Sequence, residues 1–269
     1  MLAIKNNLMA VNAARYLGQS YDALAKSVER LSSGLRINSA RDDAAGMAVR
    51  ELIRADVAVL QQGSRNAQDG ISMLQTMEGA VSTIDQLLVR MKQLAEQAAT
   101  GSYSNPQRTI MDSEFDQMAN EIERISTATD FNGMKMLDNS ATKSIHFGDT
   151  NDYIDIVGTK LTKAGLGIDA LNITTADSAK AALATIDTAI TSTTSAAAKF
   201  GYNMNRLEST RQVLDIQAEN LMTSESRISD VDVATEMATF TRNQVLSQAG
   251  TAMLAQANSI PQMALTLLR

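Results

Sequence analysis

Residues 17–35, LGQSYDALAKSVERLSSGL, place an apolar side chain at every third or fourth position. These positions are Leu17, Tyr21, Leu24, Val28, Leu31 and Leu35. Alternating steps of four and three keep them on one stripe of a helix. Because a lone surface helix cannot bury such a stripe, the stretch predicts an interface with a partner helix.

A second stretch near the other end of the chain fits the same spacing. Its apolar positions are Met204, Leu207, Leu214, Ala218, Leu221 and Ile228, with Arg211 and Glu225 as interruptions. Two such helices, separated by most of the sequence, suggest a chain that folds back and pairs its termini. Contacts with other copies of the chain fit the pattern equally well.

The composition favours thin, closely packed helices over a thick globular core. Hydrophobic residues make up 44% of the 269 positions, but aromatic residues make up only 4% and tryptophan is absent. The prolines are Pro106 and Pro261, so residues 1–105 hold no helix breaker of that type. We predict a mainly α fold: an elongated, hairpin-shaped bundle of long antiparallel coiled-coil helices with a small β-hairpin.

The element boundaries follow from apolar spacing and turn residues. Helices are expected over residues 5–32, 42–100, 106–127, 178–224 and 233–265, with the β-hairpin over residues 144–157. A loop-rich stretch is expected between the hairpin and Asp177, which is a plausible helix cap. Glycines in the second helix weaken it but permit close helix approach.

Several functional classes are excluded by charge and composition. A net charge of −6 argues against a nucleic-acid partner, and the absence of cysteine excludes disulfides and thiol chemistry. No apolar run approaches the roughly 18 residues of a membrane span. The first residues, MLAIKNNLMAVNAARY, lack the apolar core of a signal peptide. This favours the cytoplasm, unless a dedicated export machine reads an uncleaved N-terminus.

The sequence offers no catalytic, cofactor or metal site. His146 is the single histidine and has no recognisable partner for nucleophilic catalysis. The stretch 149–160 resembles a calcium loop, but Ile154 stands where glycine is needed and Lys160 where a bidentate glutamate is needed. We therefore predict that the protein is not an enzyme and binds no cofactor.

Two segments are more specific than a general coiled-coil pattern. They are ERLSSGLRINSARDDAAGMAV at residues 29–49, and residues 226–269, which include SRISDVDVATEM and QAGTAMLAQANSIPQMALTLLR. Together they resemble bacterial flagellin, the subunit of the flagellar filament. FNGMKML at residues 131–137 and the expected hairpin also match the layout of that family.

The resemblance implies a domain organisation. Residues 1–40 would form the N-terminal inner-layer helix and connector, 41–140 the N-terminal part of a rod, and 141–175 the β-hairpin and a short central segment. Residues 176–228 would form the C-terminal rod helix, and 229–269 the C-terminal inner-layer helix. The chain resembles a minimal flagellin without large outer domains. The implied polymerisation seam adds Leu254, Ile260, Leu265 and Leu268 to the stripe of residues 17–35.

The resemblance also implies a function and a set of partners. The subunit would polymerise into the flagellar filament for swimming or swarming motility, and would be secreted to the extracellular flagellum. Its partners would be other copies of itself, an export chaperone and the export apparatus, and the filament cap and hook-junction proteins. A hook–filament junction protein and a non-flagellar coiled-coil scaffold are the alternatives.

A recognition surface is implied as well. Flagellins detected by the flagellin-sensing Toll-like receptor present an Arg, a Leu four residues on, and a Glu from a neighbouring helix. Here Arg90, Leu94 and Glu114 supply these types, although Val89 replaces the Gln that often precedes the Arg. From the residues alone, the favoured interpretation is that Arg90 and Glu114 are solvated charges and that Leu94 lies in the core.

Overall fold

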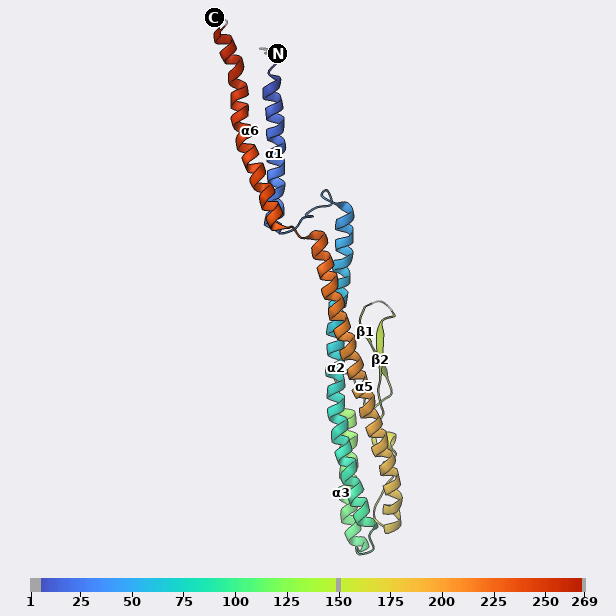
Figure 1. Cartoon of the computed structure of the whole chain (residues 1–269). Coiled ribbons are helices and arrows are strands. Elements are labelled where there is room, and N and C mark those ends of the chain that lie inside the picture. Colours follow the sequence, from blue (N-terminus) through green and yellow to red (C-terminus); the bar gives the residue numbers. More distant parts are fainter. Residues whose placement is uncertain (1–5, 149–150, 268–269) are drawn as a thin grey trace. The chain divides into compact units, whose positions relative to one another are not determined.

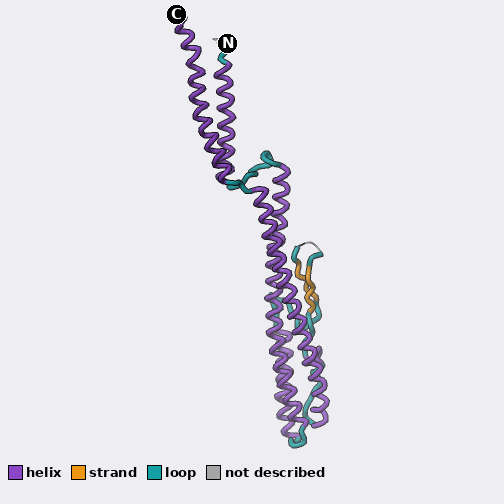
Figure 2. The backbone as a smooth tube through the Cα atoms, in the orientation of Figure 1, coloured by secondary structure: helices purple, strands orange, loops and turns teal. Residues whose placement is uncertain are grey.

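The computed structural model describes residues 6–148 and 151–267 (Figure 1). In this part of the chain the elements are α1 (Leu8–Ser33), α2 (Ala44–Ala99), α3 (Asn105–Ala128), β1 (Thr142–His146), β2 (Tyr153–Val157), α4 (Lys163–Leu166), α5 (Ala176–Ser229) and α6 (Val233–Leu267). The prediction of a mainly helical chain with a small β-hairpin is confirmed (Figure 2). Among the described residues, no helix is both long and apolar enough to cross a membrane.

The chain divides into two compact units. The terminal unit comprises Met1–Val57 and Glu219–Arg269, and the central unit comprises Ala58–Ala218. The terminal unit is therefore built from both ends of the chain, whereas the central unit is one continuous stretch. Of the second predicted stripe, Leu207 and Leu214 lie buried in the central unit, whereas Leu221 and Ile228 belong to the terminal unit.

In the terminal unit, α1 and α6 run antiparallel side by side (Figure 1). The connectors that follow α1 and precede α6 are tied together by backbone hydrogen bonds. Arg36 N donates to Ser229 O at 2.6 Å, and Val231 N donates to Gly34 O at 3.0 Å. Gly34 ends α1 with φ at 73°, in the left-handed region that favours glycine. These bonds fix where each terminal helix begins or ends.

The core of the central unit is an apolar stripe of α2 packed against α3, α5 and the hairpin. The buried residues of that stripe include Leu74, Met77, Val81, Ile84, Leu88, Met91 and Ala95. Phe115 of α3 and Phe200 of α5 are the large anchors in the same core. Alternating steps of three and four along α2 produce this burial, as expected for one helical face.

The hairpin packs onto α2 at a glycine. β1 and β2 pair antiparallel, with Ile145 opposite Ile154. Asn66 Nδ2 donates to His146 O at 2.9 Å. A Cβ added at Gly63 would lie 2.7 Å from the carbonyl carbon of Phe147, so this position leaves no room for a side chain. Glycine thus permits the close approach of helix and hairpin.

A buried arginine closes the turn between α2 and α3. Arg108 is almost fully buried, and its guanidinium donates to Ala98 O at 2.7 Å and Thr100 O at 3.1 Å. It also donates to the side chain of Asn105 at 3.0 Å. The carbonyls at the end of α2 have no partner within their own helix, so Arg108 supplies both the hydrogen bonds and a favourable charge at the negative end of the dipole.

The short helix α4 was not expected from the sequence, which reads as a loop there. Its signals are local: the Thr162 hydroxyl accepts from Gly165 N, and Gly167 ends the turn with φ at 71°. A helix of one turn has too few residues to show a repeating apolar pattern. It positions Lys163, whose backbone N donates to Glu123 of α3 at 2.7 Å.

Candidate assembly interface

One face of α1 packs against α6. Leu17, Leu24 and Leu31 of the predicted stripe are half-buried there, spaced by seven residues. Between them lie half-buried Ser20 and buried Ser27. The contact face thus alternates leucine with serine, which lets the helices come close together.

The remaining stripe residues of α1 are turned away from this contact. Tyr21 and Val28 are each 49% exposed. Leu8, Met9, Val11 and Tyr16 of the same helix are also exposed. The pairing of α1 with α6 therefore uses only half of the apolar stripe, and the other half stays open on the outside.

The matching face of α6 combines small and polar residues with two large apolar ones, Phe240 and Leu254. Its buried and half-buried positions include Phe240, Asn243, Ser247, Gly250, Leu254 and Ala257. A Cβ added at Gly250 would lie 3.0 Å from Leu17 Cδ1, so Leu17 sits against the bare backbone of α6. Asn7 Nδ2 donates to Ala257 O at 2.7 Å near the free ends of both helices.

The other predicted seam residues are distributed as follows. Leu254 and Ile260 are half-buried in α6. Leu35 is half-buried in the connector after α1, where it forms a backbone bridge with Asp230. Leu268 lies outside the described residues, and so does the side chain of Leu265.

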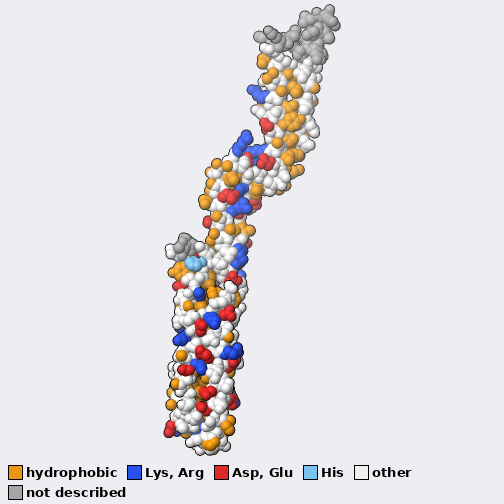
Figure 3. Space-filling view, turned by 180° about the vertical axis from the view of Figure 1, so that it is seen from behind, with side chains coloured by type: hydrophobic (Ala, Val, Ile, Leu, Met, Phe, Trp, Pro, Cys, Tyr) orange, Lys and Arg blue, Asp and Glu red, His pale blue; other side chains and the backbone are white. Residues whose placement is uncertain are grey.

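The exposed side of α6 carries large apolar residues. They are Val233, Met237, Val245, Leu246 and Met253. Figure 3 shows hydrophobic side chains along the paired helices of this unit. Between α1 and α6 an apolar groove of about 270 Å³ is lined by Met9, Asn12, Ala13, Met253, Gln256, Ala257 and Ile260. Contiguous exposed apolar surface of this kind marks a protein interaction site.

The connector after α1 is tied to α1 by an ion pair. Lys26 Nζ lies 2.7 Å from Asp42 Oδ1, and Asp42 Oδ2 accepts from the backbone N–H groups of Ser39 and Asn38. The hydrogen bond from Lys26 is the main reason that the pKa of Asp42 falls from 3.8 to about 2, with the two backbone donors adding to it. Their combined effect exceeds the opposing effect of partial burial.

This ion pair predicts acid sensitivity of the connector. Because the folded pKa of Asp42 is depressed, its stabilising contribution is complete above about pH 3.8 and is lost as the pH falls towards 2. We expect Asp42→Asn to lower stability at neutral pH and to flatten the pH profile between 4 and 2. Circular dichroism of assembled material, recorded as the pH is lowered from 4 to 2, measures the unfolding of the terminal helices. Lys26→Gln should raise the pKa of Asp42, and an unchanged acid profile in both variants would contradict the assignment.

The predicted recognition residues lie close together in the central unit, but they differ in exposure. Arg90 Nη2 of α2 lies 2.9 Å from Glu114 Oε1 of α3, and both side chains are about half exposed. Arg90 also donates to Gln93 at 3.4 Å. Leu94 is only 2% exposed and belongs to the core. Arg90 and Glu114 therefore form the accessible part of this set.

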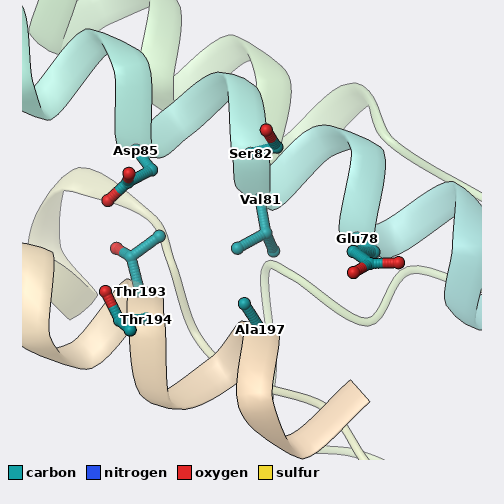
Figure 4. A pocket seen from close by; sticks show the side chains of 7 residues that line it. All are labelled: Glu78, Val81, Ser82, Asp85, Thr193, Thr194 and Ala197. Carbon is teal, nitrogen blue, oxygen red and sulfur yellow. The ribbon is translucent and has the colours of Figure 1, made fainter. Parts of the chain in front are cut away.

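A second hollow lies between α2 and α5, with a volume of about 280 Å³ (Figure 4). The carboxylate of Asp85 and the hydroxyl of Thr193 point toward one another across it. Thr193 donates to Ala189 O, so its oxygen can only accept from the hollow. Two facing acceptors without a histidine do not form a nucleophile–base pair. Within the described residues, no group of three or more histidine, aspartate or glutamate side chains is placed to hold a metal ion.

Of the α6 half of the α1–α6 contact, the predicted seam contained Leu254 and Ile260 but missed the small and polar residues. Apolar periodicity points to large residues, whereas the inner face of α6 repeats Asn243, Gly250 and Ala257 at seven-residue spacing. A search for small residues at that spacing would have found it, because small residues allow close helix approach. Large apolar residues lie on the outer surface of the α1–α6 pair as well as on its inner contact face, so their spacing did not distinguish the two.

Two family models match the chain. The model described as the bacterial flagellin N-terminal helical region matches residues 4–142. The model described as the bacterial flagellin C-terminal helical region matches residues 183–268. The matched stretches include α1, α2 and α3 on one side and α6 on the other.

Whole-length relatives carry related names. The chain is 42% identical over 272 residues to the flagellin of Halalkalibacterium halodurans, with all of both chains covered. It is 41% identical over 287 residues to the flagellar filament 33 kDa core protein of Treponema phagedenis, again over both full lengths. The crystal structure of Bacillus cereus flagellin superposes with a TM-score of 0.50 at 31% identity, covering 55% of this chain and 88% of that one.

Proposed function

The chain belongs to the bacterial flagellin family, and from this premise we propose that it polymerises into the flagellar filament through the outer faces of α1 and α6. Membership gives it a structural role in the flagellum as a minimal flagellin. In the proposed filament, residues 1–40 and 229–269 form an inner layer. Residues 41–140 and 176–228 form the rod, with the hairpin and short central segment at 141–175 between them.

The observation that carries this proposal is the exposed apolar half of the α1–α6 pair. Tyr21 and Val28 of α1 and Val245 and Leu246 of α6 remain exposed after the helices have paired. The inner contact is thin, because serine, glycine and asparagine occupy much of it. Burial of the outer residues against further copies would supply the apolar area that the isolated pair lacks.

Seeded polymerisation tests the proposal. Purified full-length chain, mixed with sheared filaments of the same protein, should elongate them into long helical polymers visible by electron microscopy. Discrete dimers under all seeding and salt conditions would favour a coiled-coil scaffold instead. Assemblies that stop growing while still short would favour the hook–filament junction alternative.

Export and its partners form the second part of the proposal. Exposed Val245, Leu246 and Met253 give the C-terminal helix a surface that promotes aggregation in the cytoplasm. A cytosolic export chaperone that covers this helix would prevent that until the chain enters the flagellar export apparatus. The extracellular filament, its cap and the hook-junction proteins are the later partners. Deletion of residues 230–269 should abolish chaperone binding, which co-purification can measure.

We also propose recognition by the flagellin-sensing Toll-like receptor through Arg90 and Glu114. Their exposed ion pair joins α2 and α3 on the surface of the central unit. Buried Leu94 would act by holding α2 in position beneath the pair rather than by direct contact.

The receptor proposal predicts a loss of signalling. Arg90→Ala removes a positive charge and the planar guanidinium with its hydrogen-bond donors. Receptor activation should therefore fall by about tenfold, the effect of losing a charged contact worth about 1.4 kcal/mol. A reporter cell line that expresses the receptor measures this. Arg124→Ala is the matched control, because Arg124 is an exposed arginine of α3 paired with Glu121. Equal signalling by both variants would contradict the proposal.

A further inference from the structure

Two methionines stand at the rims of the apolar groove between α1 and α6. Met9 belongs to α1 and is 66% exposed, and Met253 belongs to α6 and is 63% exposed. Both line the groove of about 270 Å³ together with Ala13, Ala257 and Ile260. Among the methionines whose side chains the structure describes, these are the most exposed.

Among the other methionines whose side chains the structure describes, most are buried or half-buried, and Met222 and Met237 are about half exposed. Met73, Met77, Met91 and Met136 are buried in the central unit. The chain has 15 methionines and no cysteine, so a peroxide that reaches it finds thioethers and no thiol. Since oxidation depends on access to sulfur, the reaction should select the exposed methionines from a largely protected set.

We propose that Met9 and Met253 form an oxidation-sensitive site, converted to methionine sulfoxide by hydrogen peroxide in the free subunit and protected in the polymer. This inference rests on the proposed function, because protection requires another copy to cover the groove. In each reaction the sulfur lone pair attacks one peroxide oxygen, an S–O bond forms and the O–O bond breaks. The sulfur is oxidised by two electrons and the peroxide reduced, and the departing hydroxide takes the proton of the transferred oxygen to leave as water, which gives the neutral sulfoxide.

The sulfoxide would oppose assembly for a physical reason. A thioether is apolar and flexible, so it fits an apolar groove covered by a neighbouring chain. A sulfoxide is polar and chiral, and its oxygen is hydrated in the free subunit. Covering the groove would strip that water from an oxygen facing Ala13, Ala257 and Ile260. The effect should therefore appear in assembly and leave the folded subunit largely unchanged.

The experiment uses the full-length chain in two states. Free subunits and assembled filaments are exposed to the same hydrogen peroxide concentration, the reaction is stopped with catalase, and peptide mass spectrometry follows each methionine. Met9 and Met253 should oxidise first in free subunits and at least about tenfold more slowly in filaments. Met73 and Met77 should stay unmodified in both states. Equal oxidation of Met9 and Met253 in subunits and filaments would overturn the inference.

The oxidised subunits are then tested in seeded assembly. Their critical concentration should rise about tenfold, the effect of one poorly satisfied polar group at an interface, and methionine sulfoxide reductases should reverse it. The double variant Met9→Leu/Met253→Leu should assemble after peroxide treatment. Met237→Leu should stay sensitive, because Met237 is exposed on α6 but does not line the groove. Normal assembly of subunits oxidised at both positions overturns this inference alone, whereas untreated subunits that never elongate seeds overturn the proposed function with it.

Discussion

Replacement of both Leu24 and Leu31 by aspartate should abolish filament formation. Each leucine is half-buried against α6, so each aspartate would place a charge with no designed partner in the α1–α6 contact. The cost is about 1–3 kcal/mol per site in protein interiors. Because both sites recur in every subunit, the critical concentration should rise by at least about a hundredfold, which corresponds to roughly 2.7 kcal/mol. Sedimentation of seeded mixtures measures it.

The matched control for this variant adds the same charges to α1 elsewhere. Gln19→Asp/Ser32→Asp introduces two aspartates at exposed positions of the same segment. It should polymerise near the wild-type critical concentration and keep the same helix content. The Leu24→Asp/Leu31→Asp variant should keep a normally folded central unit, since both changes lie in the terminal unit. Filaments of normal length from that variant would show that the α1–α6 contact is not required for assembly.

Gly63→Ala should destabilise the central unit by about 2–3 kcal/mol, the cost of overpacking a close contact. The added Cβ would overlap the carbonyl group of Phe147, with only 2.7 Å to its carbon. Rigid backbone, rather than a flexible side-chain end, occupies that space. The helix and the hairpin must separate, which also weakens the hydrogen bond from Asn66 to His146 O.

Gly79→Ala on the same helix provides a control with the opposite sign. A Cβ at Gly79 meets no atom within 4 Å, so the substitution should stabilise α2 by about 0.5–1 kcal/mol through lower backbone entropy in the unfolded chain. Urea unfolding of the full-length chain, followed by far-UV circular dichroism, compares the two variants. A destabilising Gly79→Ala, or a neutral Gly63→Ala, would contradict the packing described for α2.

Helical periodicity predicted most of the secondary structure. The stripe of α2 through Leu74, Leu88 and Met91 repeats for many turns, and its predicted extent of 42–100 lies close to the observed Ala44–Ala99. Long repetition averages out local interruptions, which is why the glycines of this helix did not obscure it. Arg90 and Glu114 were grouped only through the family resemblance, and the ion pair between them was not predicted.

The partner of α1 was harder to identify from sequence. Hydrophobicity favoured the stripe of residues 204–228, but its buried residues Leu207 and Leu214 pack within the central unit. The true contact face of α6 contains Ser247 and Gly250, which hydrophobic scales do not mark. Close packing of small residues depends on the shape of both helices together, and one sequence stretch does not reveal it.

The capping of α2 by Arg108 affects the order in which the parts of the subunit unfold in acid. Arg108 binds the carbonyl oxygens of Ala98 and Thr100, so protonation of carboxylates between neutral pH and pH 2 leaves these hydrogen bonds intact. The Lys26–Asp42 pair, by contrast, loses its negative partner in that range. Acid should therefore release the connector of the terminal unit while the turn between α2 and α3 stays closed. Subunits recovered from filaments brought to about pH 2 should keep an intact central unit, ready to reassemble when the pH is restored.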